Sequence, residues 1–352
     1  MTTRDTEDLA DAQTQSPPSD TVVGTTDARP GRFASLGQGL QQMLAFGTLI
    51  LLMIIFFIAS PRFLTVSNIS SILLSTAVIG ILAVGTTFVI ITGGIDLSLG
   101  TAMTLCSVVT GLLLADAGLP LPVGVLGGIA MGALIGLING FNVAILGLPP
   151  FIATLSMMLV AQGLALVLSG VRPIYFNDVE GFSKIALGEI IPKVPNAVLI
   201  LFLLALVAGV ILRKTILGRM TYAIGSNEEA TRLSGINTRR WILAIYTLAG
   251  VATGIAGVVL AARLNSAQPQ LGVGYELQAI AAVIIGGTSL LGGRGTILGT
   301  IIGALIMSVL INGLRILAIQ TEWQTVVVGL VVLIAVFADN LRKRRAEGGA
   351  HK

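Results

Sequence analysis

Two carboxylates stand beside long apolar segments, where an unpaired charge is costly. Asp96 lies in the segment 92–98, Thr-Gly-Gly-Ile-Asp-Leu-Ser, in which two adjacent glycines interrupt a helix. Asp96 and Ser98 can cap the start of the next helix, or they can contact a polar substrate on its way across a membrane. Capping is the favoured interpretation, and a place in a translocation path is the alternative.

The second carboxylate, Glu276, follows the polar loop 265–275, which begins at Asn265. Glu276 can cap the apolar helix that follows on the outer side of the membrane, and a gate or substrate role is equally well supported. We therefore group Asn265 and Glu276 with Asp96 and Ser98 as candidates for a translocation path or gate.

Two amides, Asn139 and Asn312, stand inside apolar segments. In lipid an amide needs a partner on another helix or a polar ligand. Packing between helices is the favoured interpretation. Contact with a solute is the alternative, so both residues join the candidate path.

Groups that carry enzymatic chemistry are scarce. The single cysteine, Cys106, lies in an apolar run, and the single histidine, His351, is next to the last residue. The sequence contains no cluster of metal ligands, no paired general acid and base, and no Gly-x-x-x-x-Gly-Lys-Ser/Thr loop for nucleotide phosphates. We predict no catalytic residue, no metal site and no enzyme activity. If the chain moves a solute actively, an ion gradient or another subunit supplies the energy.

The composition is that of an integral membrane protein. Of the 352 residues, 54% are hydrophobic and 11% are charged, and the mean hydropathy is +0.94. Too few polar groups remain to cover a soluble globule of this size. The net charge of +4 is small. Its cations lie mostly in loops and near the C-terminus, which favours a role in membrane orientation over nucleic-acid binding.

Segments of about 17 to 25 apolar residues are long enough to cross a bilayer as helices. They predict an all-α, polytopic membrane domain of about ten transmembrane helices over residues 43–340. The polar stretch 1–42 has no apolar periodicity and is expected to be a disordered cytoplasmic tail, and 341–352 form a basic cytoplasmic tail. The predicted spans are 43–59, 69–92, 97–115, 122–146, 151–170, 196–212, 241–262, 277–291, 296–319 and 326–338.

Positive residues orient these spans. Six lysines and arginines lie in the loop 213–240, and four more follow the last span at 342–345. Both regions are therefore predicted to be cytoplasmic. Ten spans then place the N-terminus in the cytoplasm and the loop 171–195 outside.

Glycine recurs at every fourth position on two of the predicted spans. In lipid, such small-residue ridges allow two helix backbones to approach closely. Close packing is the favoured role, and direct substrate contact is the alternative. The two ridges consist of Gly124, Gly128, Gly132, Gly136 and Gly140, and of Gly295, Gly299 and Gly303.

The same two spans share short motifs. Gly-Ala-Leu-Ile begins at Gly132 and again at Gly303, and Ile-Asn-Gly ends at Gly140 and again at Gly313. The fourth and ninth spans cross the membrane in opposite directions, as expected of an inverted-topology repeat in a transporter. Coincidence in a low-complexity membrane sequence is equally well supported.

The loop 213–240 is the main hydrophilic feature between the spans. Within it, the stretch 229–235, Glu-Ala-Thr-Arg-Leu-Ser-Gly, is typical of a short helix. A membrane subunit needs such a docking element to receive force from a separate motor protein. The loop therefore points to a chain that is driven by a partner.

The sequence resembles the permease subunits of ribose-type ABC importers, which serve monosaccharides and related small polyols. The similarity covers about residues 63–339, and the polar tail has no counterpart in the family pattern. The motifs that carry it are Thr-Gly-Gly-Ile-Asp-Leu-Ser at 92–98, Ala-Ile-Gly-Ser-Asn-Glu-Glu-Ala at 223–230 with Ser-Gly-Ile at 234–236, and Tyr-Glu-Leu-Gln-Ala-Ile-Ala-Ala at 275–282 running into Gly-Gly-Thr-Ser-Leu-Leu-Gly-Gly-Arg-Gly at 286–295.

This resemblance implies a type II-like permease in the bacterial inner membrane that pairs with a second copy of itself or with a related permease. It also implies a cytoplasmic ATP-binding subunit, which holds ATP and Mg²⁺, and an extracytoplasmic sugar-binding protein; the permease itself binds no cofactor. In related importers a Glu-Ala-Ala-x-x-x-Gly element docks on the ATPase, and 229–235 fits it with Thr231 in place of the second alanine. The residues thereby assigned to ATPase coupling are Asn227, Glu228, Glu229, Ala230 and Gly235.

The implied function is alternating-access import of a monosaccharide or polyol, without covalent chemistry in this chain. Because the binding protein sets the affinity, the path needs only weak sugar contacts. The alternative is an ion-coupled secondary transporter that uses Asp96 and Glu276 as coupling carboxylates. Ribose, xylose, arabinose, galactose, inositol and smaller polyols all remain open as substrates.

Overall fold

The protein is a bundle of helices with one small pair of strands. The structure, a computed structural model, describes residues 32–348, with side chains from residue 42 to 339 and at 341. A bilayer offers no hydrogen-bonding partners, so an apolar segment satisfies its backbone groups internally as a helix. The elements are α1 (Arg32–Ala59), α2 (Val66–Ile91), α3 (Leu99–Gly111), η1 (Leu112–Asp116), α4 (Leu121–Ala144), α5 (Pro150–Ser169), β1 (Ile174–Tyr175), α6 (Lys184–Leu187), α7 (Asn196–Lys214), α8 (Ile216–Ser226), α9 (Glu228–Leu233), α10 (Thr238–Leu264), β2 (Ser266–Ala267), α11 (Tyr275–Ile285), α12 (Ile297–Ile316) and α13 (Thr321–Gly348).

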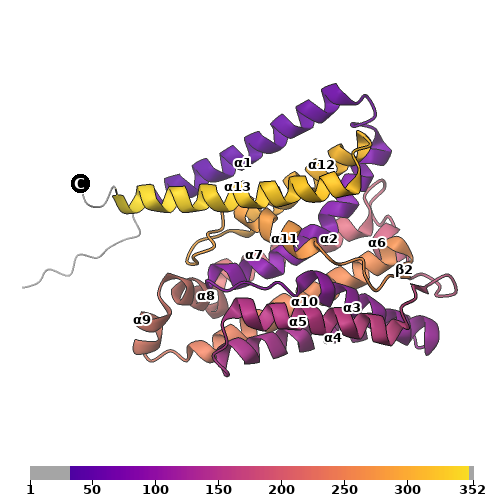
Figure 1. The fold of residues 1–352 in the computed structure, drawn as a ribbon, viewed down its shortest axis with the longest axis horizontal. Coiled ribbons are helices and arrows are strands. Elements are labelled where there is room, and N and C mark those ends of the chain that lie inside the picture. Colours follow the sequence, from indigo (N-terminus) through magenta and orange to yellow (C-terminus); the bar gives the residue numbers. More distant parts are fainter. Residues whose placement is uncertain (1–31, 349–352) are drawn as a thin grey trace, which may run out of the picture.

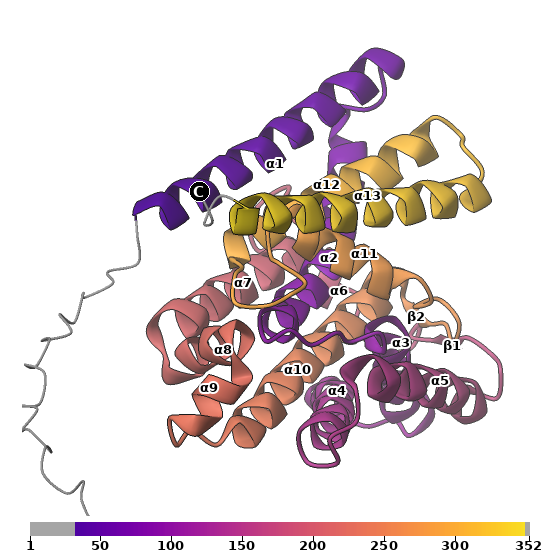
Figure 2. The ribbon, with the colours of Figure 1, turned by 60° about the vertical axis from the view of Figure 1, so that its left-hand side comes forward.

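The central helix of the bundle is α2. It is buried along most of its length and packs against α7, α10, α11 and α12. Figure 1 shows α1 and α13 along one edge of the bundle and α4 and α5 along the opposite edge. The helices α8 and α9 lie at one end, and the strands β1 and β2, which pair antiparallel, lie at the other (Figure 2).

Within residues 32–348, nine helical segments are long and apolar enough to cross a membrane: α1, α2, α3 with η1, α4, α5, α7, α10, α12 and α13. Their positions agree with nine of the ten predicted spans. The helix α13 extends well beyond the predicted span 326–338, and α1 begins at Arg32, inside the region assigned to the N-terminal tail. Residues 1–31 and 349–352 lie outside the part of the chain that the structure describes.

The predicted eighth span, 277–291, is wrong as a full helix. Its helix, α11, comprises Tyr275–Ile285 only, which is about 16 Å long, half of a hydrocarbon core of about 30 Å. The helix ends at two glycines, of which Gly287 has a φ of 95°, a left-handed conformation that a helix cannot contain. The rest of this crossing is made by residues 265–274, which include β2.

The two glycine ridges lie at contacts between helices. On α4, Gly132 and Gly136 face the backbone of α10 at Gly250 and Gly254. The helices α4 and α10 form the most extensive helix pair in the described chain. On α12, Gly299 and Gly303 face the end of α11 in the same manner. The remaining ridge glycines meet η1, α3, α10 or the loop 286–295, at Leu114 for Gly124, Thr110 for Gly128, Leu243 for Gly140 and Thr288 for Gly295.

Each helix with a glycine ridge follows a membrane crossing that consists of an irregular stretch and a shorter helix, which we call a broken crossing. The order of a long helix, an irregular stretch, a shorter helix and a ridged helix occurs in α2–α3–α4 and again in α10–α11–α12. The helix α2 ends at the end of the bundle where α10 begins, so the two series run in opposite directions (Figure 2). This arrangement favours an inverted repeat over coincidence for the shared motifs of α4 and α12.

Candidate functional site

The residues 92–98, which we call the link, connect α2 to α3 without forming a helix. Gly93 has a φ of 81°, a conformation that glycine adopts without steric cost. Because the link lacks the continuous hydrogen bonds of a helix, a helix next to it bonds to part of its backbone. Leu97 donates its N–H to Thr154 Oγ1 of α5 at 3.1 Å, and the same hydroxyl lies 3.3 Å from the carbonyl of Ile95.

A buried chain of hydrogen bonds joins the link to α4. Asp96 Oδ1 accepts bonds from the N–H of Ser98 at 2.9 Å and from Ser98 Oγ at 2.6 Å. Asn139 donates from Nδ2 to Ser98 Oγ at 2.9 Å. Ser98 makes no side-chain cap bond to α3, so the expected capping role is replaced by an internal turn. Three of the six candidate path residues therefore form one connected group.

Two polar atoms near this group have no hydrogen-bond partner among the described residues. They are Asn139 Oδ1 and the hydroxyl of Tyr246 on α10, and both residues are buried. The Tyr246 hydroxyl lies beside the link, since a Cβ at Gly94 would be 2.7 Å from it. An unsatisfied buried polar group costs about 1–3 kcal/mol. These two atoms are therefore buried beside the link without a hydrogen-bond partner among the described residues.

Glu276 lies at the start of α11 and is buried. Its Oε1 accepts the N–H of Gly274 at 2.9 Å, so one of the two carboxylate oxygens has a capping role at the start of α11. Its Oε2 has no partner in the described chain and lies against Gly100 of α3, as does the carbonyl of Gly272. The two broken crossings therefore touch at Gly100, where no larger residue fits.

The other two candidate path residues lie elsewhere. Asn265 ends α10 with a φ of 51° and donates from Nδ2 to Asn177 Oδ1 at 3.0 Å, in the loops beside β1 and β2. Asn312 lies on α12, next to Gly313, which contacts Phe56 of α1. Its Oδ1 is buried and has no partner among the described residues. Both are therefore separate from the group around Asp96.

The predicted docking element forms the short helix α9, which projects from the end of the bundle (Figure 2). Asn227 caps it by accepting the N–H of Ala230 at 2.9 Å, and Glu228 accepts the Thr238 hydroxyl at 3.1 Å. Thr231 is buried against the bundle, whereas Leu233 is 80% exposed. The helix α9 therefore has one side against the bundle and one side exposed.

The helix α8 connects α9 to the link. Gly225, near the end of α8, lies directly against the carbonyl of Ile91, and a Cβ there would be 2.6 Å from the nitrogen of Gly293. Gly293 in turn donates its N–H to the Ile91 carbonyl at 2.8 Å. We call this meeting of Ile91, Gly225 and Gly293 the glycine joint. It brings the ends of α2 and α8 and the loop 286–296 into backbone contact.

A side chain reinforces the connection between α8 and the same loop. The hydroxyl of Tyr222 donates to the carbonyl of Gly295 at 2.7 Å. Burial raises the pKa of the Tyr222 hydroxyl, so this group stays protonated and remains a donor at neutral pH. The described residues contain no group of three or more histidine, cysteine, aspartate or glutamate side chains that could hold a metal ion.

The family of the chain is established by comparison with known proteins. The sequence profile of the family described as "Branched-chain amino acid transport system / permease component" matches residues 68–336. The chain belongs to this permease family. The link, the glycine joint and α9 all lie within the matched part of the permease.

Individual relatives cover most of the permease. The ribose import permease protein of Escherichia coli is 41% identical over 322 residues, which is 91% of this chain and 100% of the relative. The fructose import permease protein of Rhizobium meliloti is 37% identical over 289 residues, 80% of each chain. A probable ABC transporter permease protein of Sinorhizobium fredii is 35% identical over 330 residues, 92% of this chain and 98% of the relative. No solved structure matches the permease.

These findings confirm the family resemblance and the all-helical membrane fold predicted for the permease. Three residues at its candidate sites were missed from the sequence: Thr154, Gly225 and Tyr246. Tyr246 carried a signal, since it is a hydroxyl-bearing aromatic within an apolar span. Gly225 lay inside a recognised motif, 223–230, without a role of its own.

Proposed function

We propose that this permease is the membrane subunit of an ATP-driven importer that carries a monosaccharide or a related polyol into a bacterial cell. One relative is named for ribose and another for fructose, which supports the substrate class. A third is named as an ABC transporter permease. The comparisons therefore favour this function over the ion-coupled alternative, in which Asp96 and Glu276 would be coupling carboxylates.

The observation that carries the proposal is the short backbone route from α9 to the link. Asn227 alone separates α9 from α8, and Gly225 of α8 contacts Ile91, the last residue of α2. No flexible side chain lies between these backbones, so a displacement of α9 is transmitted to the link rather than absorbed. In this proposal the link and the loop 265–274 rearrange when a motor protein moves α9.

The motor is proposed to be a separate cytoplasmic ATP-binding subunit, which holds ATP and Mg²⁺. A groove of about 700 Å³ lies beside α9, between the loop after α4 and the start of α10. Its wall includes Glu228, Arg232 and Gly235. This groove supports docking of the ATPase on Asn227, Glu228, Glu229, Ala230 and Gly235.

The remaining partners follow from the same proposal. A second copy, or a related permease, completes the translocation path, and an extracytoplasmic binding protein delivers the sugar to the end of the bundle that carries β1 and β2. Both termini then lie in the cytoplasm, as the positive residues of the loop 213–240 indicate. The permease itself hydrolyses nothing and binds no cofactor.

The polar groups of the bundle are proposed to have different roles along the path. Asp96 and Ser98 hold the link in shape, and the buried Asn139 Oδ1 and Tyr246 hydroxyl provide weak contacts for sugar hydroxyls once the link rearranges. Glu276 Oε2 is proposed to act where the two broken crossings touch. Asn265 and Asn312 are proposed to act mainly in loop structure and in helix packing, respectively.

Transport in a defined system tests the proposal. The permease is reconstituted into proteoliposomes with the ATPase and the binding protein encoded beside its gene, and the sugar is chosen by ligand screening of that binding protein. Uptake is expected to require ATP and to continue when an ionophore removes all ion gradients. Uptake that persists without ATP and stops with the ionophore would refute the function.

A further inference from the structure

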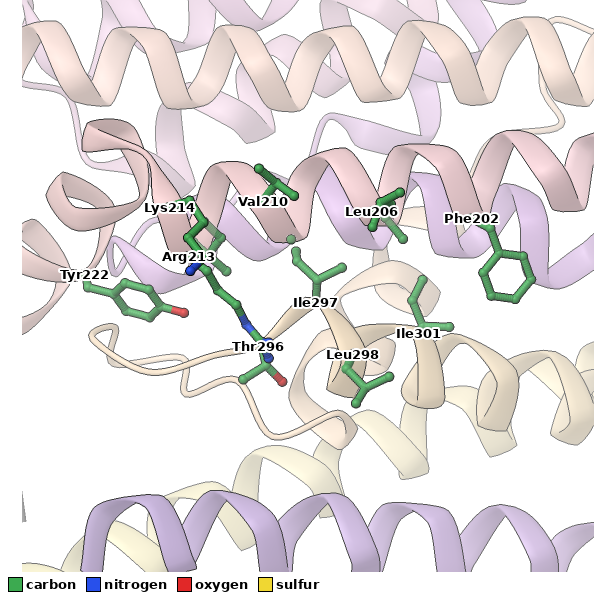
Figure 3. Close-up of a pocket in the computed structure, with 13 residues that line it drawn as sticks. Phe202, Leu206, Val210, Arg213, Lys214, Tyr222, Thr296, Ile297, Leu298 and Ile301 are labelled. Atoms are coloured by element: carbon green, nitrogen blue, oxygen red, sulfur yellow. The ribbon is translucent and has the colours of Figure 1, made fainter. Parts of the chain in front are cut away.

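A cavity of about 550 Å³ opens between α7 and the beginning of α12 (Figure 3). Its volume lies within the range of small-molecule sites, about 300–1,000 Å³. The lining side chains Phe202, Leu206, Val210 and Leu298 are each more than half exposed. The helices α7 and α12 are both long enough to span the membrane, so this cavity opens on an apolar side of the bundle at membrane depth.

The polar groups of the cavity gather at one end. Figure 3 shows Arg213, Tyr222 and Thr296 at that end and Phe202 and Ile301 at the other. Lys214 also lines the cavity, and the described acidic residues form no ion pair with either cation. The N-terminus of α12, a helix of 20 residues, lies at the same end and adds positive potential.

The depth of the cavity matches one leaflet of a bilayer. Phe202 and Arg213 are about three helical turns apart on α7, which corresponds to about 16 Å along the helix axis. This is about half of a hydrocarbon core of roughly 30 Å. A helix of a second copy would cover the full height of the bundle, whereas a lipid has an apolar part of this length and a charged head at one end.

We infer that this cavity binds one anionic phospholipid from the leaflet next to the basic loop 213–240. Its phosphate lies beside Arg213, Lys214 and Tyr222, and one acyl chain lies along Phe202 and Val210. Basic pockets between membrane helices recognise anionic headgroups in this way. Because Tyr222 also holds the loop before α12 through Gly295, the bound lipid braces the segments that meet at the glycine joint.

Lipid binding to the full-length chain tests this inference without any transport. The protein is purified in detergent, titrated with phosphatidylglycerol or phosphatidylcholine, and measured by native mass spectrometry. One phosphatidylglycerol per chain is expected to bind before phosphatidylcholine. The pair Arg213→Gln and Lys214→Gln is expected to weaken its binding roughly 30-fold. Gly209→Phe is expected to remove it with both cations intact, because a side chain at Gly209 enters open space in the cavity.

Matched control variants distinguish a specific effect on the cavity from a general loss of positive charge and from a disturbed helix. The pair Arg219→Gln and Arg240→Gln removes the same charge from the same loop but does not line the cavity. Gly163→Phe places the same side chain on α5, at another glycine with nothing within 4 Å of its Cβ. Both controls are expected to retain the lipid, and all variants should have the melting temperature of the wild type when lipid-free.

Several outcomes would overturn the inference. Equal binding of phosphatidylcholine, displacement of the lipid by millimolar inorganic phosphate, or retention by Gly209→Phe would each exclude this site for an anionic phospholipid. Cross-linking of Leu206→Cys between two copies, in a Cys106→Ser background, would show that a second copy covers the cavity instead.

Discussion

The contact between α4 and α10 depends on Gly132 having no side chain. A Cβ on Gly132 would lie 2.6 Å from the nitrogen of Gly254 and 2.8 Å from its Cα, and it would also meet the carbonyl of Gly250. All three are backbone atoms, so no rotamer change relieves the clash. For Gly132→Ala, the two helices must separate by roughly 1 Å to restore ordinary contact.

The change in the free energy of unfolding is the cost of disturbed packing minus the gain in helix propensity. Overpacking of a tight contact costs about 1–3 kcal/mol, and a separation of this size forfeits a quarter to a half of the dispersion attraction at each affected contact. Alanine is favoured over glycine within a helix by roughly 0.5–1 kcal/mol. We therefore expect Gly132→Ala to lower the free energy of unfolding by about 1–2 kcal/mol.

A control glycine isolates the packing contribution. Gly163 on α5 is also within a helix, but nothing lies within 4 Å of its Cβ position. Gly163→Ala is therefore expected to be neutral or to stabilise the protein by up to about 1 kcal/mol. Reversible unfolding of both variants in detergent micelles measures the difference. Equal stabilities would refute close packing of α4 on α10 at Gly132.

Three further predictions concern coupling and topology. Glu229→Lys is expected to leave membrane insertion intact and to weaken ATPase binding about tenfold or more by charge reversal; normal co-purification and uptake would contradict docking on α9. Gly225→Ala, which cannot fit against Ile91, is expected to reduce uptake while the ATPase still binds, and wild-type uptake would exclude the glycine joint as the route of coupling. In a Cys106→Ser background, Asp178→Cys is expected to react with an impermeant maleimide from outside and Leu233→Cys only from inside, whereas labelling from one side would overturn the proposed orientation.

The spans were predictable because the bilayer acts on each one separately. An apolar stretch of sufficient length becomes a helix wherever it occurs, and nine of the ten predicted segments do so within the described residues. The exception, 277–291, was predicted from composition alone. Its paired glycines at 286 and 287 could have indicated the early end of α11, since Gly287 takes a positive φ.

The contacts of the candidate path residues were harder to predict because they depend on distant neighbours. Asp96 and Ser98 were expected to cap α3, yet they bond to each other and to Asn139. The sequence offered no reason to pair them with Asn139 rather than with Asn312, which stands in a similar apolar segment. A hydrogen bond across 41 positions depends on how two helices pack, and helix packing in lipid responds to shape rather than to hydrophobicity.

The sequence by itself determined the class of molecule, the positions of most helices, the family and the short helix within the loop 213–240, because each of these depends on composition or on motifs contiguous along the chain. Only the tertiary structure decided which glycines face one another, that Gly225 reaches Ile91, and that the two broken crossings touch at Gly100. It also brought Arg213 of α7 and Thr296 before α12 to one cavity. These are distances between residues far apart in the chain, and they arise from the packing of whole helices.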